Sequence, residues 1–318
     1  MQKEIIELNK ENLGVMPIRK AVKSILWYAK QGIGMSKRKI QYSNKERYTP
    51  FIHSFTTLTR YAGIMKEFAD DMKAKGIRNL NSVKYEDVKS WLEVKASKYT
   101  ERTLKVNMCA LEKLFSIAGK EDIAKSINRD FTEIYSKAKP SGRVEPFVNP
   151  QGIIDRLKEK SEKAKTKLER EMYAKAWAWA SLQYLTGARV GDIKKLYVDG
   201  TKVVIPRSKG GKTRTIDFSD NKERLERVKD VLRYLSFEFE NKDVNDNSTF
   251  RHYYEKVLRD TAASLGEKWT GSHAFRVNYA IERFEEIRQS KSEFEADQQL
   301  TRELGHERIS MSQYYRKA

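Results

Sequence analysis

The chain has 318 residues, enough for two domains, and its 63 Lys and Arg against 44 Asp and Glu give a net charge of +19. This excess favours a polyanionic partner, although a basic protein without such a partner is compatible with the charge alone. We expect no membrane partner, because no apolar run could span a bilayer and the N-terminus lacks a signal-peptide core. Cys109 is the only cysteine, which excludes an intrachain disulfide and a cysteine zinc cluster and fits a reducing cytoplasm.

Residues 1–46 are polar and basic and are predicted to form an N-terminal arm that touches a nucleic-acid backbone. A solvated leader is the alternative. The apolar pattern between Pro17 and Lys30 suits a short helix within this arm. Gly32 and Gly34 have the Gly-x-Gly spacing that begins a phosphate-binding loop. The preceding strand and the third glycine of such a loop are missing, so the pattern does not indicate one.

Residues 47–139 are predicted to form a helical domain. Apolar residues recur at three- and four-residue steps from Pro50, and Gly76 ends this first helix. Asp122 is predicted to cap the last helix of the domain. Four short helices of this kind make a small bundle. The three later helices are expected at residues 85–96, 100–118 and 122–138.

Residues 140–151 are predicted to link two domains. This stretch holds Pro140, Pro146 and Pro150, which are half of the six prolines in the chain, together with Gly142. Proline stiffens a segment and stops helices, so the stretch favours a domain boundary. An ordinary surface loop is the alternative.

Residues 152–318 are predicted to form a second, α+β domain. Residues 153–185 indicate one or two helices, and residues 203–205 and 213–218 are β-prone runs joined by a glycine turn. The whole chain is therefore mainly α with a small β-hairpin or sheet. The later helices are expected at residues 222–239, 249–265 and 272–289, with two short ones after them.

The predicted hairpin is basic. Between Thr201 and Ile216 it has five basic residues and no acidic residue. Such a tip is suited to reach into a groove or along the phosphates of a nucleic acid. The five basic residues are Lys202, Arg207, Lys209, Lys212 and Arg214.

Phosphate-binding side chains gather toward the end of the chain. His273 and Arg276 are spaced His-x-x-Arg, which puts an imidazole and a guanidinium on one helical face. That pair suits a phosphate, since arginine offers a fork of donors and histidine donates or accepts a proton. His306 follows in Leu-Gly-His, and Tyr315, nine residues later, is a candidate nucleophile. Upstream, Arg189 in Thr-Gly-Ala-Arg adds a second guanidinium.

In chain order these residues, with Lys209, read Arg, Lys, His-x-x-Arg, His, Tyr, and at this point the sequence resembles the tyrosine recombinase (phage integrase) family. The resemblance implies an N-terminal helical, SAM-like core-binding domain at 47–139 and a catalytic domain at 152–318. It implies a cytoplasmic, nucleoid-associated enzyme of DNA recombination and integration, encoded on a phage, plasmid, transposon or chromosome. Such an enzyme cleaves and rejoins double-stranded DNA at specific sites through a 3′-phosphotyrosine, as a homo-tetramer on two duplexes.

The resemblance also implies a role for each matching residue. Arg189 and Arg276 would hold the non-bridging phosphate oxygens, and preorganised cations of this kind suit a transition state that gains negative charge. His273 and His306 would donate to the phosphate, and His273 would also accept the proton of Tyr315. The remaining assignments are Lys209 as general acid, Asp192 as an orienting partner in the pocket, and Lys202, Arg207, Lys212 and Arg214 as DNA contacts. No metal and no other cofactor is expected.

Several alternatives stay open. Lys212 competes with Lys209 for the acid role, and Tyr314 competes with Tyr315, although the spacing from His306 favours Tyr315. A type IB topoisomerase shares the phosphotyrosine chemistry but relaxes supercoils as a monomer. A DNA-binding protein without activity is the third class of function.

Overall fold

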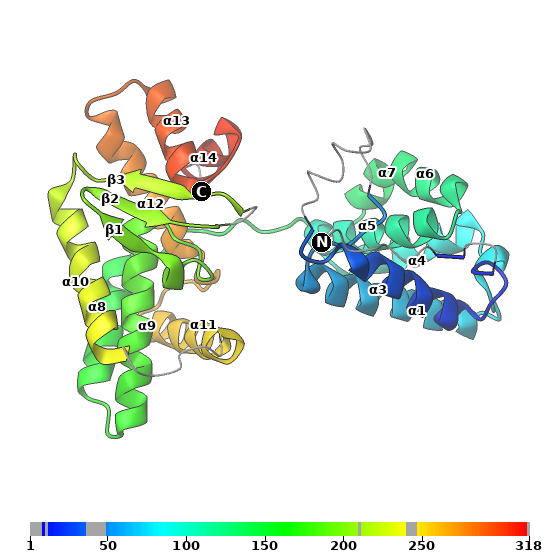
Figure 1. Cartoon of the computed structure of the whole chain (residues 1–318), viewed down its shortest axis with the longest axis horizontal. Helices are drawn as coiled ribbons and strands as arrows, with labels where there is room; N and C mark the ends of the chain where they lie inside the picture. The colour runs from blue at the N-terminus through cyan, green and yellow to red at the C-terminus, as the bar shows by residue number, and fades with distance from the viewer. Residues whose placement is uncertain (1–7, 10–11, 36–48, 209–210, 240–246, 317–318) are drawn as a thin grey trace, which may run out of the picture. The chain divides into compact units, whose positions relative to one another are not determined.

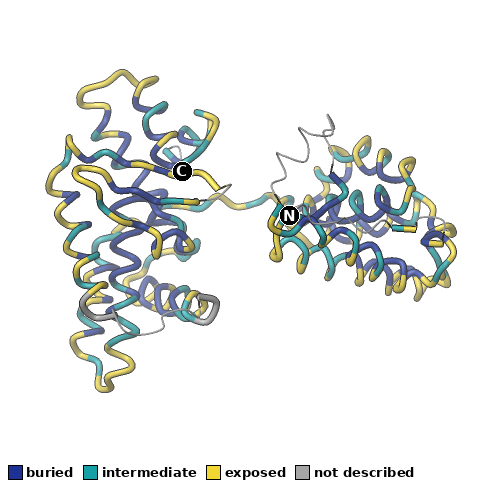
Figure 2. Tube along the Cα trace, viewed as in Figure 1, coloured by how far each residue is buried: buried dark blue, intermediate teal, exposed yellow. Residues whose placement is uncertain are grey.

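The computed structural model describes residues 8–9, 12–35, 49–208, 211–239 and 247–316. The chain divides into two compact units, Met1–Gly142 and Arg143–Ala318 (Figure 1). Each unit encloses a hydrophobic core of its own, visible as the dark segments along the inside of each in Figure 2. Within the described residues, no helix is both long and apolar enough to cross a membrane.

The first unit is a bundle of helices around aromatic side chains. The ring of Phe68 meets Trp91 and Phe115 edge-on at centroid distances of 5.5 Å and 5.8 Å, an arrangement that aromatic quadrupoles favour. The elements are α1 (Ile18–Ala29), η1 (Lys30–Gly32), α3 (Phe55–Ala74), η2 (Leu80–Ser82), α4 (Tyr85–Lys98), α5 (Glu101–Ile117), α6 (Glu121–Arg129) and α7 (Phe131–Ser136).

The segment that the sequence assigned to an arm contributes a helix to this core. Ile18, Val22 and Ile25 of α1 are buried, and α1 packs against α3. The short helix expected between Pro17 and Lys30 is therefore present, as an integral part of the bundle.

The helix expected at residues 122–138 is wrong as a single element. It breaks at Asp130 (φ −91°, ψ 10°) into α6 and α7. The Asp130 carboxylate accepts a hydrogen bond of 2.8 Å from the Tyr85 hydroxyl, and aspartate favours such non-helical positions. Asp122 lies in the first turn of α6 and does not cap it, because Lys120 is the N-cap residue.

The second unit combines a small sheet with longer helices, as the sequence predicts. The sheet is antiparallel, three-stranded and ordered β1-β2-β3, and its first strand was not expected. Residues 153–185 form two helices rather than one. The elements are α8 (Pro150–Glu162), α9 (Lys167–Thr186), η3 (Ile193–Lys195), β1 (Tyr197–Asp199), β2 (Lys202–Ile205), β3 (Arg214–Asp217), α10 (Lys222–Phe239), α11 (Asn247–Ser264), α12 (Ala274–Arg288), α13 (Glu293–Leu304) and α14 (Ile309–Arg316).

Helix α12 connects most of this unit. It packs against α9, α13 and α14, and β3 packs against α13 (Figure 1). The first turn of α12, the end of α13 and the short helix α14 are therefore brought together beside the sheet. This arrangement places the histidines and the tyrosine of the C-terminal stretch within one region.

A buried ion pair joins α12 to α13. Arg283 of α12 is fully buried and donates from Nε to the Glu303 carboxylate at 3.1 Å. The Tyr279 hydroxyl donates to the same carboxylate at 2.8 Å. Burial lowers the pKa of Arg283, but the Glu303 carboxylate outweighs it, so the net shift is upward. The last turn of α13 is thereby fixed against α12.

We predict that Glu303→Gln destabilises the protein by about 1.5–3 kcal/mol, because it removes the only buried carboxylate among the partners of Arg283 in the described residues and leaves the less buried Asp220 and Glu286, each at 3.0 Å. Urea unfolding followed by circular dichroism measures this change. The matched control is Glu226→Gln, which removes an exposed carboxylate paired with Lys229 at 2.6 Å and should leave the unfolding midpoint unchanged. Equal midpoints for the two variants would show that the buried pair does not hold α13.

Candidate active site

The loop after α9 carries Arg189. Helix α9 ends at Thr186, and Gly187 follows in the left-handed conformation with φ 58°. A Cβ atom at Gly187 would lie 2.4 Å from the Tyr279 ring, so a glycine is needed both for the turn and for this close approach. The turn directs the chain toward the start of α12.

Arg276, in the first turn of α12, is fully buried and joins three segments. Its Nη1 donates to the carbonyl of Gly187, and its Nη2 donates to the carbonyl of Leu304 at 2.5 Å. Nη2 also lies 3.2 Å from Nε2 of His306, which accepts because a guanidinium has no acceptor. The structure thus brings Arg276 and His306 together with the turn that precedes Arg189.

His273 and Tyr315 are in hydrogen-bond contact. Nε2 of His273 lies 2.9 Å from the Tyr315 hydroxyl oxygen. The ring of His306 lies 5.6 Å from the same tyrosine ring, and the guanidinium carbon of Arg276 lies 5.7 Å from its centroid. Tyr315 is 6% exposed. Both histidines and Arg276 therefore surround one buried tyrosine.

Tyr314 is directed elsewhere. Its ring meets Tyr315 edge-on at 5.8 Å, and the guanidinium carbon of Arg143 lies 5.1 Å from its centroid. Neighbouring residues of a helix point about 100° apart, so the two tyrosines face different surroundings.

Asp192 contacts both Arg189 and Ser208, which lies just after β2 in the hairpin. The buried Asp192 carboxylate accepts a bond of 2.6 Å from the Ser208 hydroxyl and lies 3.9 Å from Nη1 of Arg189. That Nη1 also donates to Ser208 at 3.3 Å. Sequence reasoning missed Ser208, and its only signal is its place beside Lys209. Lys209 itself lies outside the described residues.

The other basic residues of the hairpin differ in exposure. Lys202, Arg207 and Lys212 are exposed, which is compatible with contact to a polyanion. Lys212 forms an ion pair with Glu307, next to His306. This pair connects the hairpin to the turn between α13 and α14.

Arg214 corrects an expectation. It was assigned to the DNA-contacting surface, but it is 2% exposed, and its Nε and Nη2 donate to the carbonyl of Glu303 at 2.8 Å and 2.6 Å. Its burial follows from the alternation of β3, in which Arg214 and Ile216 face inward and Thr215 faces outward. The apolar residues two and four positions later, Ile216 and Phe218, are the signal that could have identified the inward face.

The three guanidiniums influence one another. Burial, together with the nearby Arg214 and Arg189, lowers the pKa of Arg276 to about 9. Burial likewise lowers the pKa of Arg214 to about 10, with Arg189 adding to the effect. A cluster of positive charge in a partly dry site favours an anion such as a phosphate.

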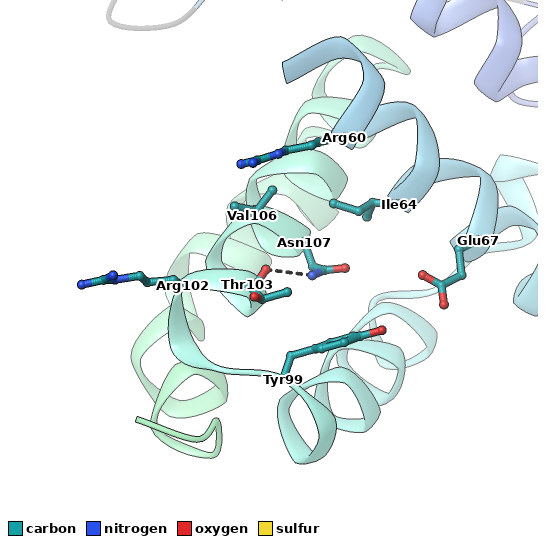
Figure 3. Close-up of a pocket in the computed structure, with 8 residues that line it drawn as sticks. All are labelled: Arg60, Ile64, Glu67, Tyr99, Arg102, Thr103, Val106 and Asn107. Carbon is teal, nitrogen blue, oxygen red and sulfur yellow. Dashed lines mark hydrogen bonds between the residues drawn. The ribbon is translucent and has the colours of Figure 1, made fainter. Parts of the chain in front are cut away.

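Two features bear on metal and ligand binding. Among the described residues, no group of three or more His, Cys, Asp or Glu side chains is placed to hold a metal ion. A pocket of about 520 Å³ lies in the first unit between α3 and α5 (Figure 3). Arg60 and Arg102 extend on the same side of its mouth, while Glu67 and Tyr99 line the opposite side.

The comparisons with known proteins agree on the fold. Residues 51–124 match the family model "Phage integrase, N-terminal". No curated protein matches the chain in sequence. Two crystal structures of the XerH site-specific recombinase bound to difH substrates match, each with a TM-score of 0.60. The post-cleavage complex is 16% identical and the match covers 98% of this chain and 94% of that one. The pre-cleavage complex is 15% identical and the match covers 99% of this chain and 96% of that one.

A lambda integrase dimer bound to a COC′ core site matches with a TM-score of 0.54 and 16% identity, over 88% of this chain and 75% of that one. At these identities the structural matches establish the fold. Residues 51–124 therefore resemble the N-terminal domain of phage integrases, and the chain shares its fold with the XerH recombinase and lambda integrase structures.

Proposed function

We propose that this chain is a site-specific DNA recombinase that cleaves and rejoins DNA through a 3′-phosphotyrosine formed by Tyr315. The observation that carries the proposal is the distance of 2.9 Å between Nε2 of His273 and the Tyr315 hydroxyl, beside the buried guanidinium of Arg276. A nucleophile in hydrogen-bond reach of a base and next to a phosphate-binding cation is the arrangement that such chemistry requires.

In the proposed reaction, residues of this chain accept and donate the protons and neutralise the developing charge. His273 accepts the hydroxyl proton as the Tyr315 oxygen attacks phosphorus, and the bond from phosphorus to the 5′ oxygen breaks. Arg189 and Arg276 neutralise the charge that develops on the non-bridging oxygens. Lys209 gives a proton to the departing 5′ oxygen. Rejoining reverses these steps, so the phosphodiester energy is conserved in the phosphotyrosine.

Entry of the phosphate requires Tyr315 to move. In this arrangement the Tyr315 ring lies over Arg276, whose two terminal nitrogens bond carbonyls. Nε of Arg276 is buried and has no hydrogen-bond partner among the described residues. A shift of Tyr315 away from the guanidinium would expose Nε of Arg276 as a donor for a phosphate oxygen. The Tyr315 hydroxyl would then approach phosphorus on the side opposite the departing 5′ oxygen.

DNA contact would involve both units. The first unit would act as the core-binding domain, and Arg60 and Arg102, which line the pocket between its α3 and α5, would contact phosphates (Figure 3). In the second unit, the exposed Lys202, Arg207 and Lys212 would contact the backbone. Strand exchange needs two duplexes and four active sites, so we propose a homo-tetramer on DNA. A monomer that only relaxes supercoils is the type IB topoisomerase alternative, which an assay of strand exchange distinguishes.

We predict that Tyr315→Phe forms no covalent adduct with DNA, because it removes the attacking oxygen. Tyr314→Phe is the matched control: it removes one hydroxyl from the neighbouring residue and should form adduct within about threefold of wild type, since Tyr314 faces Arg143. The measurement uses nicked duplexes tiled across the DNA that flanks the gene, with adducts separated on denaturing gels. Adduct from Tyr315→Phe would refute the assignment, and none from wild type would favour a DNA-binding protein without activity.

We predict that Lys209→Ala cleaves ordinary DNA slowly but recovers on DNA with sulfur at the 5′ bridging position. A thiolate leaves without protonation, so a general acid becomes unnecessary. Lys212→Ala is the control; its lysine pairs with Glu307, and its smaller defect should not be rescued. Rates of adduct formation on the two DNAs decide between the lysines, and rescue of Lys212→Ala alone would exchange their roles.

A further inference from the structure

Two arginines hold neighbouring carbonyls at the end of α13. Nε and Nη2 of Arg214 donate to the carbonyl of Glu303 at 2.8 Å and 2.6 Å, and Nη2 of Arg276 donates to the carbonyl of Leu304 at 2.5 Å. The last carbonyls of a helix lack partners within the helix and form the negative end of its dipole. Cations from β3 and α12 therefore meet at the turn that leads to His306.

The Arg214 side chain also packs against Gly305, which lies in that turn. Gly305 has φ 67°, and a Cβ atom there would lie 2.7 Å from Cδ and 2.8 Å from Cγ of Arg214. The amide of His306 donates to the carbonyl of Thr301 at 2.9 Å, which closes the turn. The position of His306 thus depends on a glycine packed directly on the Arg214 side chain.

Stability alone gives Arg214 little reason to be an arginine. Its Nη1 is buried without a hydrogen-bond partner in the described residues, and its other two nitrogens donate to a backbone carbonyl and not to a carboxylate. Burial lowers its pKa to about 10, whereas the pKa of Arg283, which pairs with Glu303, is raised. A buried cation without a counter-charge is less favourable than a well-packed apolar side chain. Residues that break this rule are expected where a site needs them.

We propose that Arg214 is a positioning residue of the cleavage reaction: by holding the Glu303 carbonyl and supporting Gly305, it places His306 against Arg276 and the phosphate. It acts through His306 and does not touch DNA. Because Arg214 stands on the strand that follows Lys209, it also connects the hairpin to the His306 turn. The proposal rests on the function proposed above and deepens it.

The first experiment does not depend on DNA cleavage. In DNA-free protein labelled with ¹³C-histidine, the His306 ring signal is assigned by its loss in His306→Gln. Arg214→Met should shift this signal and leave that of His252 unchanged. Arg224→Met is the matched control, since Arg224 is also buried but pairs with Glu282 at 2.6 Å and Glu286 at 3.4 Å on α12. It should leave the His306 signal in place.

The second experiment measures cleavage on the nicked duplex that wild type cuts. Arg214→Met should bind this DNA within about threefold of wild type and cleave it about 10- to 100-fold more slowly, since a displacement of about 1 Å has effects of this size. Arg214→Met combined with His306→Ala should cleave no more slowly than His306→Ala alone, because both changes act on one group. Arg214→Lys keeps one donor and should recover part of the rate.

The outcomes separate the two proposals. If wild type makes no adduct, the proposed function fails, while the histidine signal still tests the role of Arg214. If Arg214→Met does not fold, Arg214→Lys should show a smaller shift of the same signal. An unmoved His306 signal in a folded Arg214 variant, or additive losses of rate in the double variant, would overturn the positioning role.

Discussion

The end of α13 is held by three buried guanidiniums. The carbonyls of Glu303 and Leu304 each accept a bond from a buried guanidinium, and the Glu303 side chain accepts from Arg283 as well. Each cation loses hydration on burial, so the arrangement persists only because the helix dipole and the carbonyl oxygens replace water. This junction places His306, while α14 with Tyr315 is held by further contacts to α13 such as those of Ser312 with Thr301 and Asp297.

The same junction explains how distant parts of the sequence form one site. Arg276 bonds the carbonyl of Gly187, two residues before Arg189, and it also bonds the carbonyl of Leu304, two residues before His306. Helix α12 then presents His273 to Tyr315. A single buried guanidinium therefore sets the spacing between the loop after α9 and the two C-terminal helices. Such preorganisation is the condition under which fixed charges act on a transition state without rearranging.

Local signals predicted most of the helices and the two β-prone runs, because spacing along a helix and β-branched residues are visible in one sequence. The chemistry of Arg, His and Tyr singled out His273, Arg276, His306 and Tyr315, which lie together in the structure. Tertiary contacts decided what could not be predicted. The helix break at Asp130 depends on a hydroxyl 45 residues away in the chain, that of Tyr85. The burial of Arg214 depends on which face of β3 packs against α13. The other basic residues that the structure describes in the hairpin are exposed, so the sequence suggested that Arg214 is exposed as well. Ser208 joins the site through tertiary hydrogen bonds to Asp192 and Arg189, which no local pattern predicts.

The most direct measurement is peptide mapping of the protein after it has been trapped on cleaved DNA. Nuclease digestion leaves a nucleotide on the attacking residue, and mass spectrometry of the peptide from α14 locates it. The account predicts a nucleotide joined through its 3′-phosphate to Tyr315, the residue whose hydroxyl lies 2.9 Å from His273. A nucleotide on Tyr314 or on any residue outside α14, or a linkage through a 5′-phosphate, would contradict it.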